Sequence, residues 1–124
     1  MSARQFHLTI IAFVALAYMT VRIGIAPESG WLRFHTTDFL AGVALPSVIA
    51  LAFDDVSVSR LPGTLGGKLA LTAGAVVVWE GIVPLVSERS TADWRDVIAY
   101  FAGTAVQHVV QAAAFSAPKV AVND

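Results

Sequence analysis

The sequence predicts an all-α integral membrane protein, a bundle of four transmembrane helices arranged as two helical hairpins. Of its 124 residues, 56% are hydrophobic and only 14% are charged, whereas an average soluble domain is roughly 25% charged. The mean hydropathy is +0.70. Four apolar segments come close to the roughly 20 residues that cross a bilayer, and polar turn residues separate them. Residues 1–124 are therefore predicted to form a single transmembrane domain.

Composition also excludes some classes of function. The net charge is −1, so there is no basic surface to neutralise a row of phosphates, and we predict no nucleic-acid partner. The chain has no cysteine, which removes disulfides and thiolate metal sites. We predict neither a metal nor another cofactor.

The first two predicted helices cover residues 6–26 and 37–53. The first run is about twenty residues long, more than the 7–15 of a signal-peptide core, so we interpret it as a retained transmembrane helix. The second and shortest run begins at a Thr-Thr-Asp cap formed by residues 36–38 and contains Pro46. Membrane helices tolerate proline where a neighbour satisfies the freed carbonyl. A re-entrant segment is the alternative for this run.

The other two predicted helices cover residues 69–86 and 93–117. Ser90 and Asp93 have the spacing of a capping box before the last helix. The longest polar linker, residues 54–68, joins the two predicted hairpins and contains two pairs of turn residues, Pro62-Gly63 and Gly66-Gly67.

Orientation is weakly determined, because four basic residues fall on each predicted face of the membrane. One face holds Arg4, Arg60, Lys68 and Lys119, and the other holds Arg22, Arg33, Arg89 and Arg95. We favour cytoplasmic termini in the cell membrane, because the first group lies in plain loops or tails.

Polar residues gather on the face formed by the first and third connections. If the third helix ends at Val86, Glu80 lies about 9 Å inside it. A carboxylate at that depth is costly unless it is paired, so we expect Glu80 to hold a proton or to pair with Arg22 or Arg89. The predicted pocket comprises Arg22, His35, Asp38, Glu80, Arg89, Asp93, Asp96 and Tyr100.

Several of these residues have simpler interpretations. Asp38, Asp93 and Asp96 suit helix N-termini for capping and dipole reasons alone. The three tryptophans near this face are explained by an aromatic belt without any ligand; they are Trp31, Trp79 and Trp94.

A polar stripe continues down the last helix from Asp96 and Tyr100, at helical spacing. In lipid such a stripe must face protein or water, so it is either interhelical packing or the wall of a cavity. The stripe comprises Gly103, Thr104, Gln107, His108 and Gln111. His108 suits a hydrogen-bonded interhelical residue better than a metal ligand.

Four of these positions carry a resemblance to a known family. Glu80, Arg89, Asp96 and Gly103 resemble the C-terminal half of the VanZ-like membrane proteins, and the segment from His35 to Asp38 is similar to the start of that family's second helix. The sequence departs from the family at Val83, where a polar residue is usual, and at Tyr100, where asparagine is usual. The resemblance implies a four- to five-helix membrane protein whose namesake is tied to glycopeptide resistance. It brings no established chemistry.

Three functions follow from these patterns. The leading prediction is a one-sided pocket that binds an anionic lipid or lipid-linked envelope component through its two arginines. The alternative is an accessory subunit of a larger membrane complex, mated through the polar stripe. A proton or ion conductor ranks last, because the lower half of the first three helices offers little beyond Thr9 and Thr72. No nucleophile identifies an enzyme.

Overall fold

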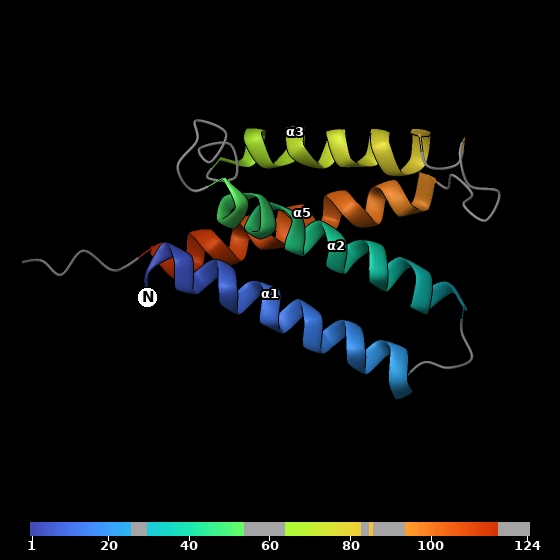
Figure 1. Cartoon of the computed structure of the whole chain (residues 1–124), viewed down its shortest axis with the longest axis horizontal. Coiled ribbons are helices and arrows are strands. Elements are labelled where there is room, and N and C mark those ends of the chain that lie inside the picture. Colours follow the sequence, from blue (N-terminus) through green and yellow to red (C-terminus); the bar gives the residue numbers. More distant parts are fainter. Residues whose placement is uncertain (26–29, 54–63, 83–84, 86–93, 117–124) are drawn as a thin grey trace, which may run out of the picture.

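The structure, a computed structural model, describes residues 1–25, 30–53, 64–82, 85 and 94–116. Its four helical passes are all long and apolar enough to cross a membrane, which confirms the predicted membrane bundle (Figure 1). The passes are α1 (Ala3–Thr20) with the π-helical turn η1 (Val21–Ile25), α2 (Gly30–Ala52), α3 (Leu65–Val76) with η3 (Val77–Ile82), and α5 (Trp94–Phe115).

The bundle is built around one central pair of helices. α2 packs most extensively against α5, while α1 packs on α2 and α3 packs on α5. The N-terminal end of α1 and the C-terminal end of α5 lie at the same end of the bundle (Figure 1). α2 and α5 therefore form the centre of the bundle. The first helix of each predicted hairpin, α1 or α3, lies outside this central pair.

Two glycines set the distance between α2 and α5. A Cβ atom on Gly42 would overlap the carbonyl oxygen of Tyr100, and a Cβ on Gly103 would overlap the carbonyl oxygen of Phe39. The two backbones touch here, as small residues allow in membrane helix pairs. The crossing fixes which faces of α2 and α5 meet.

The helix α2 passes through Pro46 without a break and includes an apolar span, His35–Ala52. It is therefore one continuous helix that is long and apolar enough to cross a membrane. Proline has no N–H, so it leaves the carbonyl of the residue four positions earlier without its helical partner. Here that carbonyl belongs to Gly42. Thr104 Oγ1 on α5 lies 3.3 Å from it and 3.1 Å from the carbonyl of Tyr100 on its own helix, so the two carbonyls share one hydroxyl donor. The neighbouring helix thus places a donor beside the carbonyl that proline leaves without its helical partner.

Two predicted helix starts were wrong. α2 begins at Gly30, so residues 36–38 lie inside the helix and do not cap it. No helix-breaking residue lies between Gly30 and the apolar run, so the helix extends back to Gly30. α3 begins at Leu65, where the Thr64 hydroxyl accepts a hydrogen bond from the Gly67 N–H at 3.0 Å. Lys68 therefore belongs to a helix and not to the linker. The predicted capping box at residues 90–93 lies outside the described residues.

Candidate functional site

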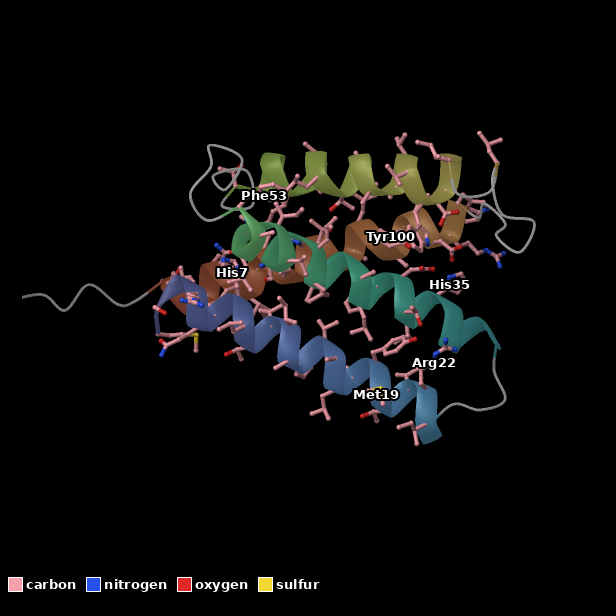
Figure 2. All side chains as sticks on the ribbon, viewed as in Figure 1. His7, Met19, Arg22, His35, Phe53 and Tyr100 are labelled. Atoms are coloured by element: carbon pink, nitrogen blue, oxygen red, sulfur yellow. The ribbon has the colours of Figure 1, made fainter. Side chains whose placement is uncertain are left out.

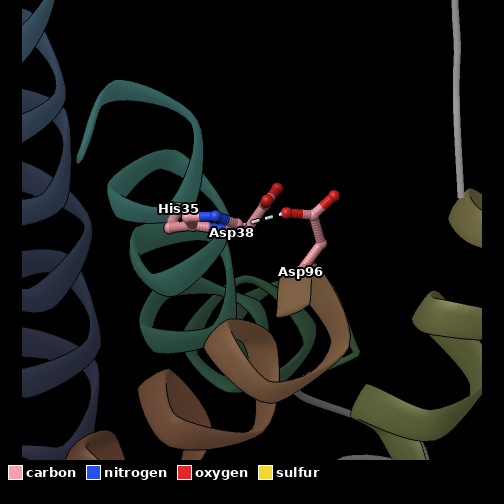
Figure 3. Close-up of side chains that lie close together, drawn as sticks. All are labelled: His35, Asp38 and Asp96. Carbon is pink, nitrogen blue, oxygen red and sulfur yellow. Dashed lines mark ion pairs between the residues drawn. The ribbon is translucent and has the colours of Figure 1, made fainter. Parts of the chain in front are cut away.

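Four polar side chains from α2 and α5 meet at one end of the bundle. His35 and Asp38 lie one turn apart on α2, and Asp96 and Tyr100 lie one turn apart on α5, so each pair shares a helix face. His35 Nδ1 lies 3.1 Å from Asp96 Oδ1 (Figure 3). The Asp38 carboxyl is hydrogen-bonded to both Asp96 and Tyr100. We call these four residues the carboxylate cluster.

The charge of this cluster favours a cation. The carboxylates of Asp96 and Glu80 both interact electrostatically with that of Asp38. His35 and Asp96 are largely covered, with side chains 17% and 19% exposed. Two carboxylates at hydrogen-bonding distance require a shared proton or a cation between them, because their charges repel strongly away from bulk water. The cluster is therefore suited to hold a proton or to bind a positively charged group.

A cavity of about 290 Å³ adjoins the cluster between α2, α3 and α5. Its polar end is formed by Thr37, Asp38 and Tyr100. Its apolar wall is formed by Ala41, Leu45, Ala75 and Trp79. A second cavity of about 530 Å³ is lined by His35 of the cluster and by Trp94, Arg95, Ile98 and Ala99. Residues of the cluster thus line two cavities.

The structure does not bring all of the predicted pocket residues together. Arg22 is exposed on η1, and its Nε donates to the Tyr18 hydroxyl at 3.0 Å, one turn earlier on the same pass. Among the described residues, Arg22 lines neither of the two cavities beside the cluster. Glu80 is half-buried on η3, whereas Arg89 and Asp93 lie outside the described residues. The predicted pair of arginines is therefore not assembled in the part of the chain that the structure describes.

The polar stripe of α5 faces the interior of the same bundle. Gly103, Thr104 and Gln107 are buried. Thr104 Oγ1 lies 2.6 Å from Thr72 Oγ1 on α3, and Gln107 Nε2 donates to Ser47 Oγ on α2 at 3.3 Å. These three residues therefore contact helices of their own chain, which leaves little of the stripe for a partner protein.

A second polar group occupies the opposite end of the bundle. Lys68 is 0% exposed; its Nζ donates to Gln111 Oε1 at 2.8 Å and lies 3.2 Å from His108 Nδ1. Nearby, His7 Nδ1 is hydrogen-bonded to Ser47 Oγ at 3.0 Å. Figure 2 shows His7 at one end of the bundle and His35 and Tyr100 toward the other. We call His7, Ser47, Lys68, His108 and Gln111 the lysine cluster.

The sequence interpretation missed Lys68, His7 and Ser47 as interior residues. Lys68 follows Gly66 and Gly67 and is charged, so hydropathy assigned it to the linker between the two hairpins. One signal was available: Lys68 lies four residues before Thr72, so a helix starting at Thr64 would put both on one face. His7 and Ser47 stood alone in apolar runs and gave no such signal.

The fold and its interior define a small multi-pass membrane protein with buried polar side chains near both ends of a four-helix bundle. No family model, curated protein or solved structure matches the chain. The VanZ-like resemblance therefore stays a prediction from residue spacing.

Proposed function

We propose that this protein binds the primary amine headgroup of an aminophospholipid in the cavity between α2, α3 and α5. The observation that carries the proposal is the division of this cavity into a polar end, with the Asp38 carboxylate and two hydroxyl groups, and an apolar wall. A primary ammonium group donates three hydrogen bonds and carries the opposite charge. The apolar wall suits the two methylene groups that adjoin the ammonium group of ethanolamine.

This proposal changes the charge of the ligand that the sequence predicted. An anionic headgroup needs cationic partners, and Arg22 is engaged with Tyr18. The acidic partners of Asp38 are Asp96 and Glu80, which would attract an ammonium group and repel a headgroup that carries only negative charge. An anionic ligand would depend on Arg89, which lies outside the described residues.

The size and position of the cavity support a headgroup rather than a whole lipid. A volume of about 290 Å³ is at the lower end of the range of ligand pockets, roughly 300 to 1,000 Å³. Trp79 lines the cavity and is 57% exposed, so one wall lies at the surface of the bundle. Acyl chains could remain in the bilayer while the headgroup occupies the cavity.

Thermal stability of the detergent-purified protein tests this proposal. Phosphatidylethanolamine should stabilise the wild type more than phosphatidylcholine, whose headgroup has no N–H; a ligand at 100 times its Kd contributes about 2.7 kcal/mol. Asp38→Asn should lose the difference between the two lipids, and Arg22→Gln should keep it. Stronger stabilisation by phosphatidylglycerol, abolished by Arg22→Gln, would overturn the proposal and favour the anionic ligand.

A second candidate function, proton conduction, is favoured by one specific observation. From the sequence alone, proton conduction ranked last because the half of the bundle nearer the termini was expected to contain few polar groups. That expectation was wrong. The lysine cluster lies there, and Thr72 and Thr104 are buried between it and the carboxylate cluster. Interior polar side chains in a membrane protein are typical of ion and proton pathways. The same residues also form hydrogen bonds between helices, so a packing role is the alternative to conduction.

Proton flux into proteoliposomes, followed with an enclosed pH dye, separates these two roles. A conductor should acidify the vesicle lumen under a potential, and both Asp38→Asn and Lys68→Met should reduce the rate at least about tenfold, with Arg22→Gln unchanged. Flux equal to that of empty vesicles in the wild type would exclude conduction and leave the buried groups a packing role.

A further inference from the structure

We propose that His35, Asp38 and Asp96 bind a divalent first-row transition metal ion. One nitrogen and two carboxylate atoms, one from each residue, all lie within 4.8 Å of one another (Figure 3). Asp38 is common to this site and to the proposed amine site, so a bound metal ion and a bound ammonium group would exclude each other there. Metal binding is measured without lipid, so either proposal can fail without the other.

The distances suit direct coordination. Ligand atoms about 2.0–2.2 Å from a tetrahedral zinc ion lie roughly 3.3 Å apart. The separation of 3.1 Å between His35 Nδ1 and Asp96 Oδ1 is already close to that value. The third ligand atom, on Asp38, lies within 4.8 Å of the other two.

Contacts around the three ligands hold them in position. His35 and Asp38 come from α2 and Asp96 comes from α5, and the contact of the two backbones at Gly42 and Gly103 holds these helices in register. The Tyr100 hydroxyl is hydrogen-bonded to Asp38, the kind of outer contact that orients a metal-binding carboxylate. The ligands are therefore held by rigid elements.

Electrostatics supplies the second reason for a metal. Asp38 and Asp96 are partly covered and adjacent, and Glu80 adds a third negative charge nearby. A divalent cation would remove this repulsion more completely than a single shared proton. The cavity of about 530 Å³ lined by His35 leaves room for a water or substrate at an open coordination position, as catalytic and transport sites require.

The donor set indicates the class of metal. Imidazole suits zinc, iron, cobalt and nickel, whereas magnesium and calcium prefer oxygen ligands alone. With one imidazole and two carboxylates, the site should prefer Zn²⁺, Co²⁺ or Mn²⁺ to Mg²⁺. Cobalt is the useful probe, because its visible spectrum reports direct coordination.

Titration of tag-free, metal-free protein in detergent with Co²⁺ tests the inference. The wild type should bind one cobalt ion per chain with visible absorption, and zinc, but not magnesium, should displace it. His35→Gln, Asp38→Asn and Asp96→Asn should each weaken the affinity at least about tenfold. His108→Gln, which removes a histidine at the opposite end of the bundle, is the matched control and should bind cobalt as the wild type does. Glu80→Gln removes a nearby charge but no ligand, so it should weaken the affinity less than the three ligand variants.

Two results would overturn the inference. One is the absence of cobalt absorption in wild-type protein that elutes as a single species. The other is equal weakening by Glu80→Gln and by the three ligand variants, which would show attraction to a negative face rather than coordination. Circular dichroism of each variant excludes loss of fold as the cause of weaker binding.

Discussion

Gly103→Ala is expected to lower the free energy of unfolding by about 2 kcal/mol or more, an unusually large effect for one methyl group. A Cβ at this position overlaps the backbone of α2 at Phe39 and Val43. Backbone atoms cannot rotate away as a side chain can, so α2 and α5 must separate along their whole contact. Unfolding of the purified protein in detergent, followed by circular dichroism, measures the change.

The same substitution at Gly74 is the matched control. Gly74 lies inside α3, and a Cβ there meets no atom within 4 Å, so Gly74→Ala should be neutral or stabilise by up to about 1 kcal/mol through helix propensity. Gly42→Ala should behave like Gly103→Ala, and the double variant should lose less than the sum because the crossing is already open. Equal stability of Gly103→Ala and Gly74→Ala would contradict the close crossing.

Thr104→Val is the second large expected effect, a loss of about 1–3 kcal/mol. It removes the hydroxyl that is shared between the Gly42 and Tyr100 carbonyls and that lies beside the Thr72 hydroxyl. Valine has nearly the same shape as threonine, so the loss reports hydrogen bonding rather than packing. Thr104→Ser keeps the hydroxyl and should be less destabilised in the same unfolding assay.

A double-mutant cycle with Pro46 isolates the role of the Gly42 carbonyl. Pro46→Ala restores an N–H to α2, so the Gly42 carbonyl regains a helical partner. In this background Thr104→Val should be less destabilising than in the wild type, with a coupling of about 0.5–1 kcal/mol. Strictly additive effects would show that Thr104 does not replace the bond that proline removes.

The four apolar runs of the sequence were sufficient to predict the four helices, but not that α2 and α5 form the central pair. Pro46 was correctly understood as a position that needs a neighbouring helix, because a missing N–H has a fixed physical consequence. The approach of His35 and Asp38 to Asp96 also followed from the sequence, since these residues begin or lie near the starts of two adjacent membrane spans.

Other features could not be predicted because they depend on tertiary contacts. Hydropathy locates the bilayer core, not the ends of helices, so the start of α2 at Gly30 was missed. The burial of Lys68 requires Gln111, which is 43 positions away in the sequence. The position of a residue along a helix also does not give the direction of its side chain. Arg22 was predicted to pair with Glu80, but its side chain donates to Tyr18 on its own pass.

Tryptophan fluorescence tests the cavity beside the carboxylate cluster most directly. Trp79 lines the cavity, and a variant in which phenylalanine replaces Trp31 and Trp94 would leave Trp79 as the single reporter among the three tryptophans of the chain. Phosphatidylethanolamine brominated near its headgroup should quench this fluorescence more than equally brominated phosphatidylcholine or phosphatidylglycerol, and Asp38→Asn should remove the preference. Equal quenching by all three lipids, or preferential quenching by phosphatidylglycerol, would contradict an amine site at Asp38.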